Sequence, residues 1–145
     1  MIVNSIVLDM DARQAFAVVT RRISDWWPAE RRHTGDPGSR IHLLASGRFY
    51  ERASDGREVE LGKVTHWSEA RLIVLDFYIA TGPEHPTEVE ISFEESDGRT
   101  TVTVVHRPKP ESAHLWHERS PRYSASWAIV LGALARRADG LRTIR

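Results

Sequence analysis

The sequence contains no cysteine and no long uninterrupted run of apolar residues. The absence of cysteine excludes disulfide bonds and thiolate chemistry, and it fits a reducing compartment. No stretch approaches the roughly eighteen consecutive apolar residues of a membrane-spanning helix. Residues 1–11 also lack the basic segment that begins a secretory signal peptide. We therefore expect a cytoplasmic protein with no membrane insertion.

The sequence also lacks a net charge, because 20 Lys and Arg residues balance 20 Asp and Glu residues. A chain with balanced charge has no global field that attracts nucleic acid or an anionic membrane. Its arginine pairs Arg21-Arg22, Arg31-Arg32 and Arg136-Arg137 are scattered along the chain, which is typical of solvated faces. We expect no nucleic-acid partner.

The motifs of several common enzyme classes are missing. There is no Gly-x-Ser-x-Gly elbow for a nucleophilic serine and no glycine-rich loop that would hold a phosphate. His114 and His117 are three residues apart, which on a helix places both rings on one face. Zinc would still need a third and a fourth ligand, and Glu118 is the only candidate nearby in the sequence. We therefore expect no metal and no cofactor.

The chain does contain a strongly amphipathic segment at residues 120–140. Ser120 suits the N-cap of a helix and Pro121 suits its first position. Gly140 suits the residue of left-handed conformation that ends a helix. The apolar residues recur at intervals of three and four, the period of a helix with one buried face; they are Tyr123, Trp127, Val130, Leu131, Leu134 and Ala138. We predict a long helix here that needs a broad surface to cover its aromatic stripe.

The N-terminal part of the chain predicts one strand and one helix within a single domain spanning residues 1–145. Residues 2–8 are rich in Val and Ile, which favours a strand. Asp11 is a candidate N-cap for a helix over residues 12–22, whose apolar stripe continues to Trp26 and Trp27 before Pro28 ends it. Residues 29–39 have the composition of a loop, either a plain connection or a mobile flap.

The rest of the chain before the amphipathic segment predicts an antiparallel sheet. The Asp-Gly pairs at 55–56 and 97–98 favour tight hairpin turns. Residues 88–94 alternate between apolar and polar, so one face of that strand meets the core. Residues 72–79 are almost wholly apolar, which predicts cover on both sides or a face that lines a cavity. The six predicted strands are residues 40–45, 48–52, 59–67, 72–79, 88–94 and 100–107.

The order of these elements and several short motifs together resemble a known family. The motifs are Ala15-Phe16, Asp25-Trp26-Trp27-Pro28, Gly47-Arg48-Phe49-Tyr50-Glu51, Gly62-Lys63-Val64-Thr65-His66-Trp67 and Val104-Val105-His106-Arg107. In this order they resemble the START-like, or SRPBCC, superfamily, in the prokaryotic branch similar to the C-terminal domain of the activator of the ninety-kilodalton heat-shock ATPase. The chain departs from that pattern at Ser46, Glu69-Ala70 and Ser126, which affects local turns.

This resemblance implies an α+β helix-grip fold. In such a fold a curved antiparallel sheet of about seven strands wraps around a long C-terminal helix, with a helical segment after the first strand. The resemblance also implies a cavity between sheet and helix, which the superfamily commonly uses for apolar small molecules. It implies no shared reaction, because one fold supports many functions.

Aromatic side chains are the main candidates for contact with a ligand in that cavity. Aromatic residues are usually core residues, yet 5 tryptophans in 145 residues also suit a pocket for a planar or aromatic molecule. The candidate ligand-binding residues are Trp26, Trp27, Tyr50, Trp67, Tyr78, Phe93, His106, Tyr123 and Trp127.

Two ionisable residues could carry chemistry. His106 shares a strand face with Val102 and Val104, so its ring should point inward. There it could contact a ligand, act as a general base, or be hydrogen-bonded within the core. Asp76 interrupts an apolar strand and needs a counter-ion or a proton. Arg48 and Arg71 are its candidate counter-ions.

Three functions stay open at this point. The first is a binding module for an apolar or aromatic small molecule, and the second is an enzyme that uses the same cavity with His106 or Asp76 as acid or base. The third is a chaperone-associated protein-interaction domain. A pocket of about 300 Å³ or more favours the first two, whereas a filled core with an exposed apolar patch favours the third. Small-molecule binding is our leading hypothesis, and a homodimer stays open.

Overall fold

The structure, a computed structural model that describes residues 1–142, is built on one seven-stranded antiparallel sheet. The strand order across the sheet is β1-β7-β6-β5-β4-β3-β2, so β1 and β2 form its two edges. The strands are β1 (Ile2–Leu8), β2 (Arg40–Leu43), β3 (Arg48–Arg52), β4 (Glu58–Ser68), β5 (Leu72–Phe77), β6 (Thr87–Ser96) and β7 (Arg99–Arg107). The predicted helix-grip sheet, its antiparallel order and the six strands after β1 are confirmed.

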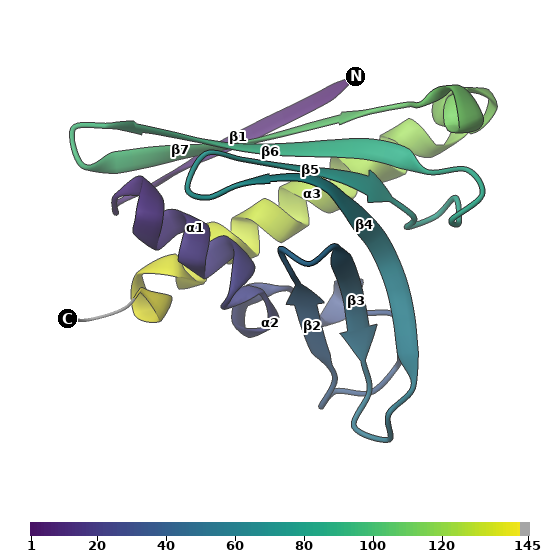
Figure 1. The fold of residues 1–145 in the computed structure, drawn as a ribbon, viewed down its shortest axis with the longest axis horizontal. Helices are drawn as coiled ribbons and strands as arrows, with labels where there is room; N and C mark the ends of the chain where they lie inside the picture. The colour runs from purple at the N-terminus through teal and green to yellow at the C-terminus, as the bar shows by residue number, and fades with distance from the viewer. Residues whose placement is uncertain (143–145) are drawn as a thin grey trace.

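The sheet curls because β3 and β4 bend it (Figure 1). Register shifts occur between Phe49 and Tyr50 and between Val64 and His66, and such bulges increase local twist. At Gly62 a side chain is excluded, because a Cβ there would lie 2.4 Å from the carbonyl oxygen of Asp76. Glycine at this position therefore lets β4 and β5 approach each other where the sheet turns.

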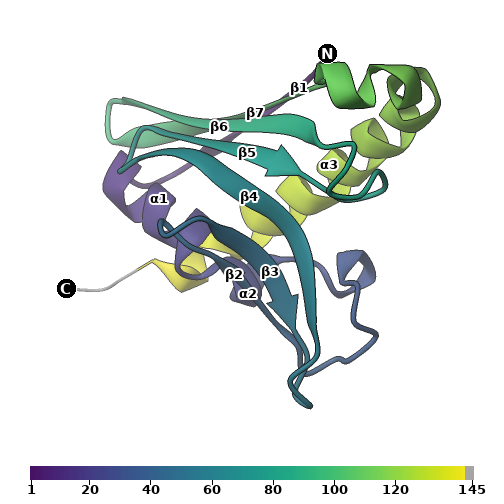
Figure 2. The same cartoon turned by 45° about the vertical axis from the view of Figure 1, so that its right-hand side comes forward.

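The helices cover the concave side of the sheet. The long helix α3 (Ala113–Leu141) crosses beneath the strands, and α1 (Ala12–Thr20) and α2 (Ile23–Trp26) lie beside its C-terminal half (Figures 1 and 2). Single 3₁₀ turns, Ala29–Arg31 and Pro110–Ser112, precede β2 and α3. The Asp11 N-cap is as predicted, because its side chain accepts from the amide of Gln14 at 2.8 Å.

The start and end of α3 differ from the prediction. The helix begins at Ala113, not at Ser120, and Pro121 lies inside it. A proline inside a helix removes one backbone hydrogen bond, but the ring of Trp116, five residues earlier, packs 5.3 Å from that of His106 and so holds the first turns against the sheet. Gly140 is helical rather than a left-handed stop, and Arg22 donates to the carbonyl of Leu141 at 3.2 Å.

The connection over residues 29–39 is held by a buried carboxylate. Glu51 has no exposed surface and accepts from the amides of His33 at 2.7 Å and Thr34 at 3.0 Å and from the Thr34 hydroxyl at 2.6 Å. Burial alone would raise the pKa of Glu51, but these hydrogen bonds outweigh it and lower that pKa. The contacts support a plain connection rather than a mobile flap.

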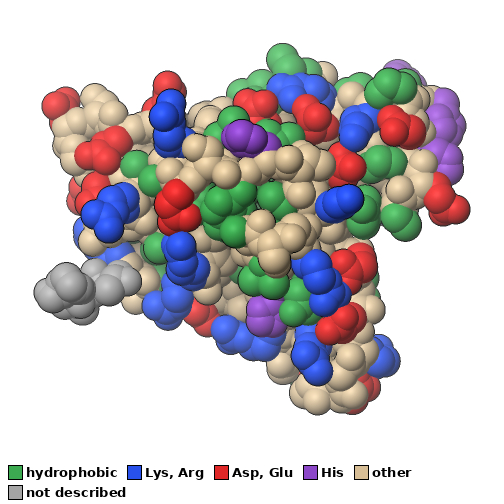
Figure 3. Space-filling view, viewed as in Figure 1, with side chains coloured by type: hydrophobic (Ala, Val, Ile, Leu, Met, Phe, Trp, Pro, Cys, Tyr) green, Lys and Arg blue, Asp and Glu red, His purple; other side chains and the backbone are tan. Residues whose placement is uncertain are grey.

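Basic and acidic side chains are interspersed over the face of the molecule shown in Figure 3, in keeping with the balanced composition. Within residues 1–142, no helix has the length and apolar character needed to span a bilayer.

Substitution Trp127→Ala tests the role of α3 in closing the sheet. Trp127 is 6 % exposed and lies in the middle of the buried stripe of the helix. Removing a buried tryptophan leaves a cavity, so we expect unfolding in denaturant to show a loss of about 3 to 5 kcal/mol. An unchanged unfolding midpoint would contradict the central packing role of this residue.

Candidate functional site

The candidate site begins with His106, a fully buried residue near the end of β7. Its ring lies among three aromatic side chains of α3 and one of β5. The distances from its ring centroid are 4.2 Å to Tyr123, 5.1 Å to Phe77, 5.3 Å to Trp116 and 6.1 Å to Trp127. The inward orientation predicted from Val102 and Val104 is confirmed, because all three side chains are buried.

Both ring nitrogens of His106 are hydrogen-bonded within the protein. The indole N–H of Trp127 donates to Nδ1 at 3.0 Å, so a neutral ring carries its proton on Nε2. Nε2 then donates to the hydroxyl oxygen of Thr87 at 2.8 Å, and that hydroxyl donates to the carbonyl of Phe77 at 3.4 Å. Burial lowers the pKa of His106 to about 3. The ring is therefore neutral at pH 7 and its two nitrogens have partners.

Two small cavities lie between the sheet and α3. The inner cavity, about 20 Å³, is lined by apolar side chains alone, among them Trp26, Leu75, Leu131 and Leu134. The outer cavity, about 40 Å³, is lined by apolar and polar side chains, including Tyr123, Ser126, Arg31 and His33. A volume of about 10–15 Å³ on this measure admits one water molecule, so neither cavity holds a larger ligand as it stands.

Three aromatic side chains, Trp27, Phe77 and Trp127, line both cavities. They therefore divide one interior space into an apolar compartment and a compartment with a polar rim. The indole N–H of Trp27 donates to the carbonyl of Arg31 at 3.0 Å, which fixes this ring to the connection after α2. The hydroxyl of Tyr123 donates to the carbonyl of Ile79 at 2.6 Å at the outer compartment.

The structure brings together four of the predicted ligand-binding residues around this space. Trp26, Trp27 and Trp127 line the inner cavity, and Tyr123 joins Trp27 and Trp127 at the outer one. His106 lies behind Tyr123 and Trp127 and lines neither cavity.

Phe93 and Trp67 form a separate aromatic group with Phe16 of α1. Their ring centroids lie 4.9 Å and 5.2 Å from that of Phe16, and neither residue lines the two cavities. Phe93 is buried, whereas Trp67 is only partly covered. These two residues anchor α1 on the sheet.

Tyr50 and Tyr78 depart from the prediction because they lie on the other face of the sheet. In an extended strand neighbouring side chains point to opposite faces, and here Phe49 and Phe77 take the inward positions. The Tyr50 ring stacks on His42 at 5.0 Å, and the guanidinium carbon of Arg48 lies 3.6 Å from its centroid. Burial raises the pKa of Tyr78, and the nearby Asp76 acts in the same direction.

Asp76 also faces away from the two cavities, and its predicted counter-ions were wrong. Lys109 Nζ lies 2.6 Å from Asp76 Oδ1, whereas Arg48 pairs with Glu58 and Glu60. Sequence spacing could not identify Lys109, because it follows the end of β7 and lies 33 residues away along the chain.

His114 and His117 lie at the exposed start of α3. The ring of His114 is 5.1 Å from that of His85, which comes from the β5–β6 connection. Among residues 1–142, no group of three or more His, Asp or Glu side chains is arranged to hold a metal ion.

Sequence reasoning missed two functional neighbours, Phe77 and Thr87. Phe77 had a usable signal, because it continues the inward alternation of Ile73 and Leu75. Thr87 had none, since its importance comes from its bond to His106, 19 residues away.

The low pKa of His106 predicts a specific loss of stability in mild acid. The unfolded chain binds this proton near pH 6.5 and the folded chain near pH 3, so the unfolded state holds more protons between these values. The free energy of unfolding should therefore be highest above pH 6.5 and should fall as the pH decreases below it, by up to about 1.4 kcal/mol per pH unit.

Chemical unfolding at several pH values between 7 and 5 measures this effect. His106→Gln, which cannot titrate, should show a shallower decline, whereas a control variant of the exposed His66, His66→Gln, should keep the wild-type slope. Equal slopes for the wild type and His106→Gln would contradict the assignment.

Comparison with known proteins places this geometry in a family. Residues 9–138 match the family described as activator of Hsp90 ATPase homolog 1-like protein. Curated proteins gave no match to the chain. The fold is shared with several solved structures, and at identities under 25% this similarity concerns the fold alone.

One similar structure is the self-sacrificing resistance protein CalC from Micromonospora echinospora, with a TM-score of 0.73, 20% identity, and coverage of 99% of this chain and 97% of that one. Another is the Aha1 dimer from Colwellia psychrerythraea, with a TM-score of 0.59, 16% identity and 94% coverage of both chains. A third is the anthrahydroquino-gamma-pyrone synthase Txn09 complexed with SUM, with a TM-score of 0.57, 23% identity, and coverage of 95% of this chain and 94% of that one.

The family match covers most of the described chain and agrees with the helix-grip sheet and the long C-terminal helix. The chain belongs to the family of activator of Hsp90 ATPase homolog 1-like proteins.

Proposed function

We propose that the chain binds a small apolar or aromatic molecule between the sheet and α3. The observation that carries this proposal is the inner cavity, a space in the centre of the core whose lining is entirely apolar. At about 20 Å³ this space is far below the roughly 300 Å³ of a ligand pocket, so a ligand enters only if the side chains that separate it from the outer cavity move. Apolar cavities large enough for a molecule do take up apolar ligands. Trp26, Trp27 and Trp127 would supply the aromatic contacts.

Entry of a ligand requires the dividing side chains to move. Trp27 is the side chain best placed to do so, because it lies at the break between α2 and the 3₁₀ turn Ala29–Arg31 and belongs to neither. Moving its indole breaks one hydrogen bond, to the carbonyl of Arg31. The two cavities that it lines would then join, and Tyr123 and Ser126 would offer polar contacts at the outer end.

Two of the similar structures support small-molecule binding by analogy. The synthase was solved in complex with SUM, and CalC is described as a self-sacrificing resistance protein. Because these similarities establish the fold alone, the proposal for this chain depends on its own cavity and lining residues.

The enzyme alternative finds less support. A general base must present a free lone pair to its substrate, but both nitrogens of His106 have partners and its pKa is about 3. Asp76 is paired with Lys109 and faces away from the cavities.

The interaction-domain alternative has one feature in its favour. Of the exposed large apolar residues among residues 1–142, Met1, Val3 and Val7 lie at or on the edge strand β1, and Leu44 follows β2 at the opposite edge. This alternative therefore rests on a short row of three side chains. A homodimer stays a prediction, supported by the dimeric state of the Aha1 structure.

A cavity-filling substitution tests the binding site. Leu131 lines the inner cavity, so Leu131→Phe should block a ligand there. Ala128→Phe is the matched control, because Ala128 is exposed on the same helix. The neutral fluorescent probe N-phenyl-1-naphthylamine, present at a hundred times its dissociation constant, should stabilise a binding-competent chain by about 2.7 kcal/mol.

Thermal unfolding with and without the probe gives the readout. We expect a rise in melting temperature for the wild type and for Ala128→Phe, and little or none for Leu131→Phe. Equal stabilisation of all three proteins would place the probe elsewhere and contradict the proposed site.

A further inference from the structure

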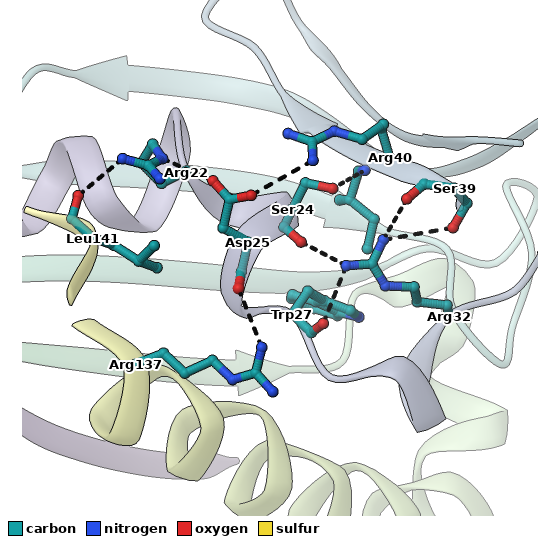
Figure 4. Close-up of polar contacts among 10 residues, drawn as sticks. Arg22, Ser24, Asp25, Trp27, Arg32, Ser39, Arg40, Arg137 and Leu141 are labelled. Atoms are coloured by element: carbon teal, nitrogen blue, oxygen red, sulfur yellow. Dashed lines mark hydrogen bonds and ion pairs between the residues drawn. The ribbon is translucent and has the colours of Figure 1, made fainter. Parts of the chain in front are cut away.

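Three arginines from distant parts of the sequence line one surface hollow of about 290 Å³. Arg32 comes from the connection before β2, Arg40 begins β2, and Arg137 lies near the end of α3 (Figure 4). The hollow, which we call the arginine hollow, is lined by Arg32, Arg40, Arg137, Ser24, Ser39, Trp27, Ala29, Pro37 and Gly38.

Arg32 is a fixed cation whose described partners are uncharged. Its Nη1 donates to the carbonyl of Ser39 at 2.8 Å, and its Nη2 donates to the carbonyls of Ser24 at 2.6 Å and Trp27 at 3.2 Å. Burial lowers the pKa of Arg32; Glu51 opposes this effect, and the positive charge of Arg40 adds to it. These carbonyls position the guanidinium without neutralising it.

Arg40 and Arg137 keep most of their donors available. A guanidinium has five N–H donors. Within residues 1–142, Arg40 makes one contact, of 3.5 Å, to Asp25 Oδ1, and Arg137 makes one, of 3.4 Å, to the carbonyl of Asp25. Both side chains are exposed at the surface.

The carboxylates near the arginine hollow are already engaged. Asp25 Oδ2 accepts from Arg22 Nε at 2.7 Å, a shorter contact than the one to Arg40. That bond to Arg22 is the main cause of the lowered pKa of Asp25. Glu51 accepts three hydrogen bonds from uncharged groups of His33 and Thr34, so it keeps its charge and offsets part of that of Arg32. The arginine hollow keeps an excess of positive charge because two carboxylates face three arginines and one of the two, Asp25, is shared with Arg22.

We propose that the arginine hollow binds the phosphate group of a small phosphomonoester. Arginine forks match phosphate oxygens in pairs and form charge-assisted hydrogen bonds with them. The volume is close to the lower end of small-molecule pockets, so it admits a short organic group as well as the phosphate. Extended polyanions fit poorly, because acidic side chains are interspersed with basic ones over the face shown in Figure 3.

This site is separate from the interior cavities of the proposed function. Trp27 lines both, but Arg40 and Arg137, the residues substituted to test phosphate binding, line neither interior cavity. Loss of phosphate binding in those variants should therefore leave the binding of N-phenyl-1-naphthylamine unchanged, and the two proposals can fail independently.

Isothermal titration calorimetry with glycerol 3-phosphate, inorganic phosphate and glycerol tests the proposal on the full chain. We expect saturable one-to-one binding of glycerol 3-phosphate, weaker binding of inorganic phosphate and no binding of glycerol. Added sodium chloride should weaken the binding, because salt screens exposed charges. Equal affinity for inorganic phosphate would assign the site to the free ion and overturn the phosphomonoester claim.

Two variants and a matched control locate the site. Arg40→Gln and Arg137→Gln should each reduce the affinity about tenfold or more, as expected for a lost hydrogen bond between charged groups. Arg136→Gln removes the same charge from the adjacent exposed residue of α3, which does not line the arginine hollow, and should bind as the wild type does.

Three results would overturn the proposal. They are wild-type affinity in both hollow variants, an equal loss in Arg136→Gln, and binding confined to polyanions such as RNA or anionic vesicles. A cooperative thermal unfolding transition like that of the wild type would show that Arg40→Gln and Arg137→Gln are still folded.

Discussion

The hydrogen bond from the Trp127 indole to His106 joins α3 to the sheet at the centre of the molecule. It satisfies two buried polar groups at once, and a buried polar group without a partner is costly. Thr87 completes the network from β6, so one chain of hydrogen bonds connects α3, β7 and β6. The position of α3 on the concave side of the sheet, and with it the division of the interior space by Trp127, follows from this constraint.

The fold could be predicted because its signals are local. The alternation of Val89, Ile91 and Phe93 identifies the inward face of β6, and the Asp-Gly turns identify the hairpins. The start of α3 could not be predicted, because the local preference of Pro121 for a first helical position is overridden by the packing of Trp116 on His106. That contact is tertiary and leaves no mark in the neighbouring sequence.

The candidate site was predictable in part for the same reason. Strand alternation gave the inward direction of His106, but its partners Thr87 and Trp127 lie 19 and 21 residues away and carry no motif. The predictions for Tyr50 and Tyr78 treated aromatic character as sufficient, although each has a phenylalanine neighbour that takes the inward position. The arginine pairs looked scattered in the sequence, and the fold brings one member of two of those pairs into a common hollow.

The central claim, that a small apolar molecule enters between the sheet and α3, can be tested through the five tryptophans. In a two-dimensional ¹H–¹⁵N spectrum each indole N–H gives one signal, which single substitutions assign. Titration with N-phenyl-1-naphthylamine should shift the signals of Trp27 and Trp127 saturably, because both rings line the two cavities, and leave Trp67 unchanged. Saturable shifts at Trp67 with Trp27 and Trp127 unaffected would contradict the claim.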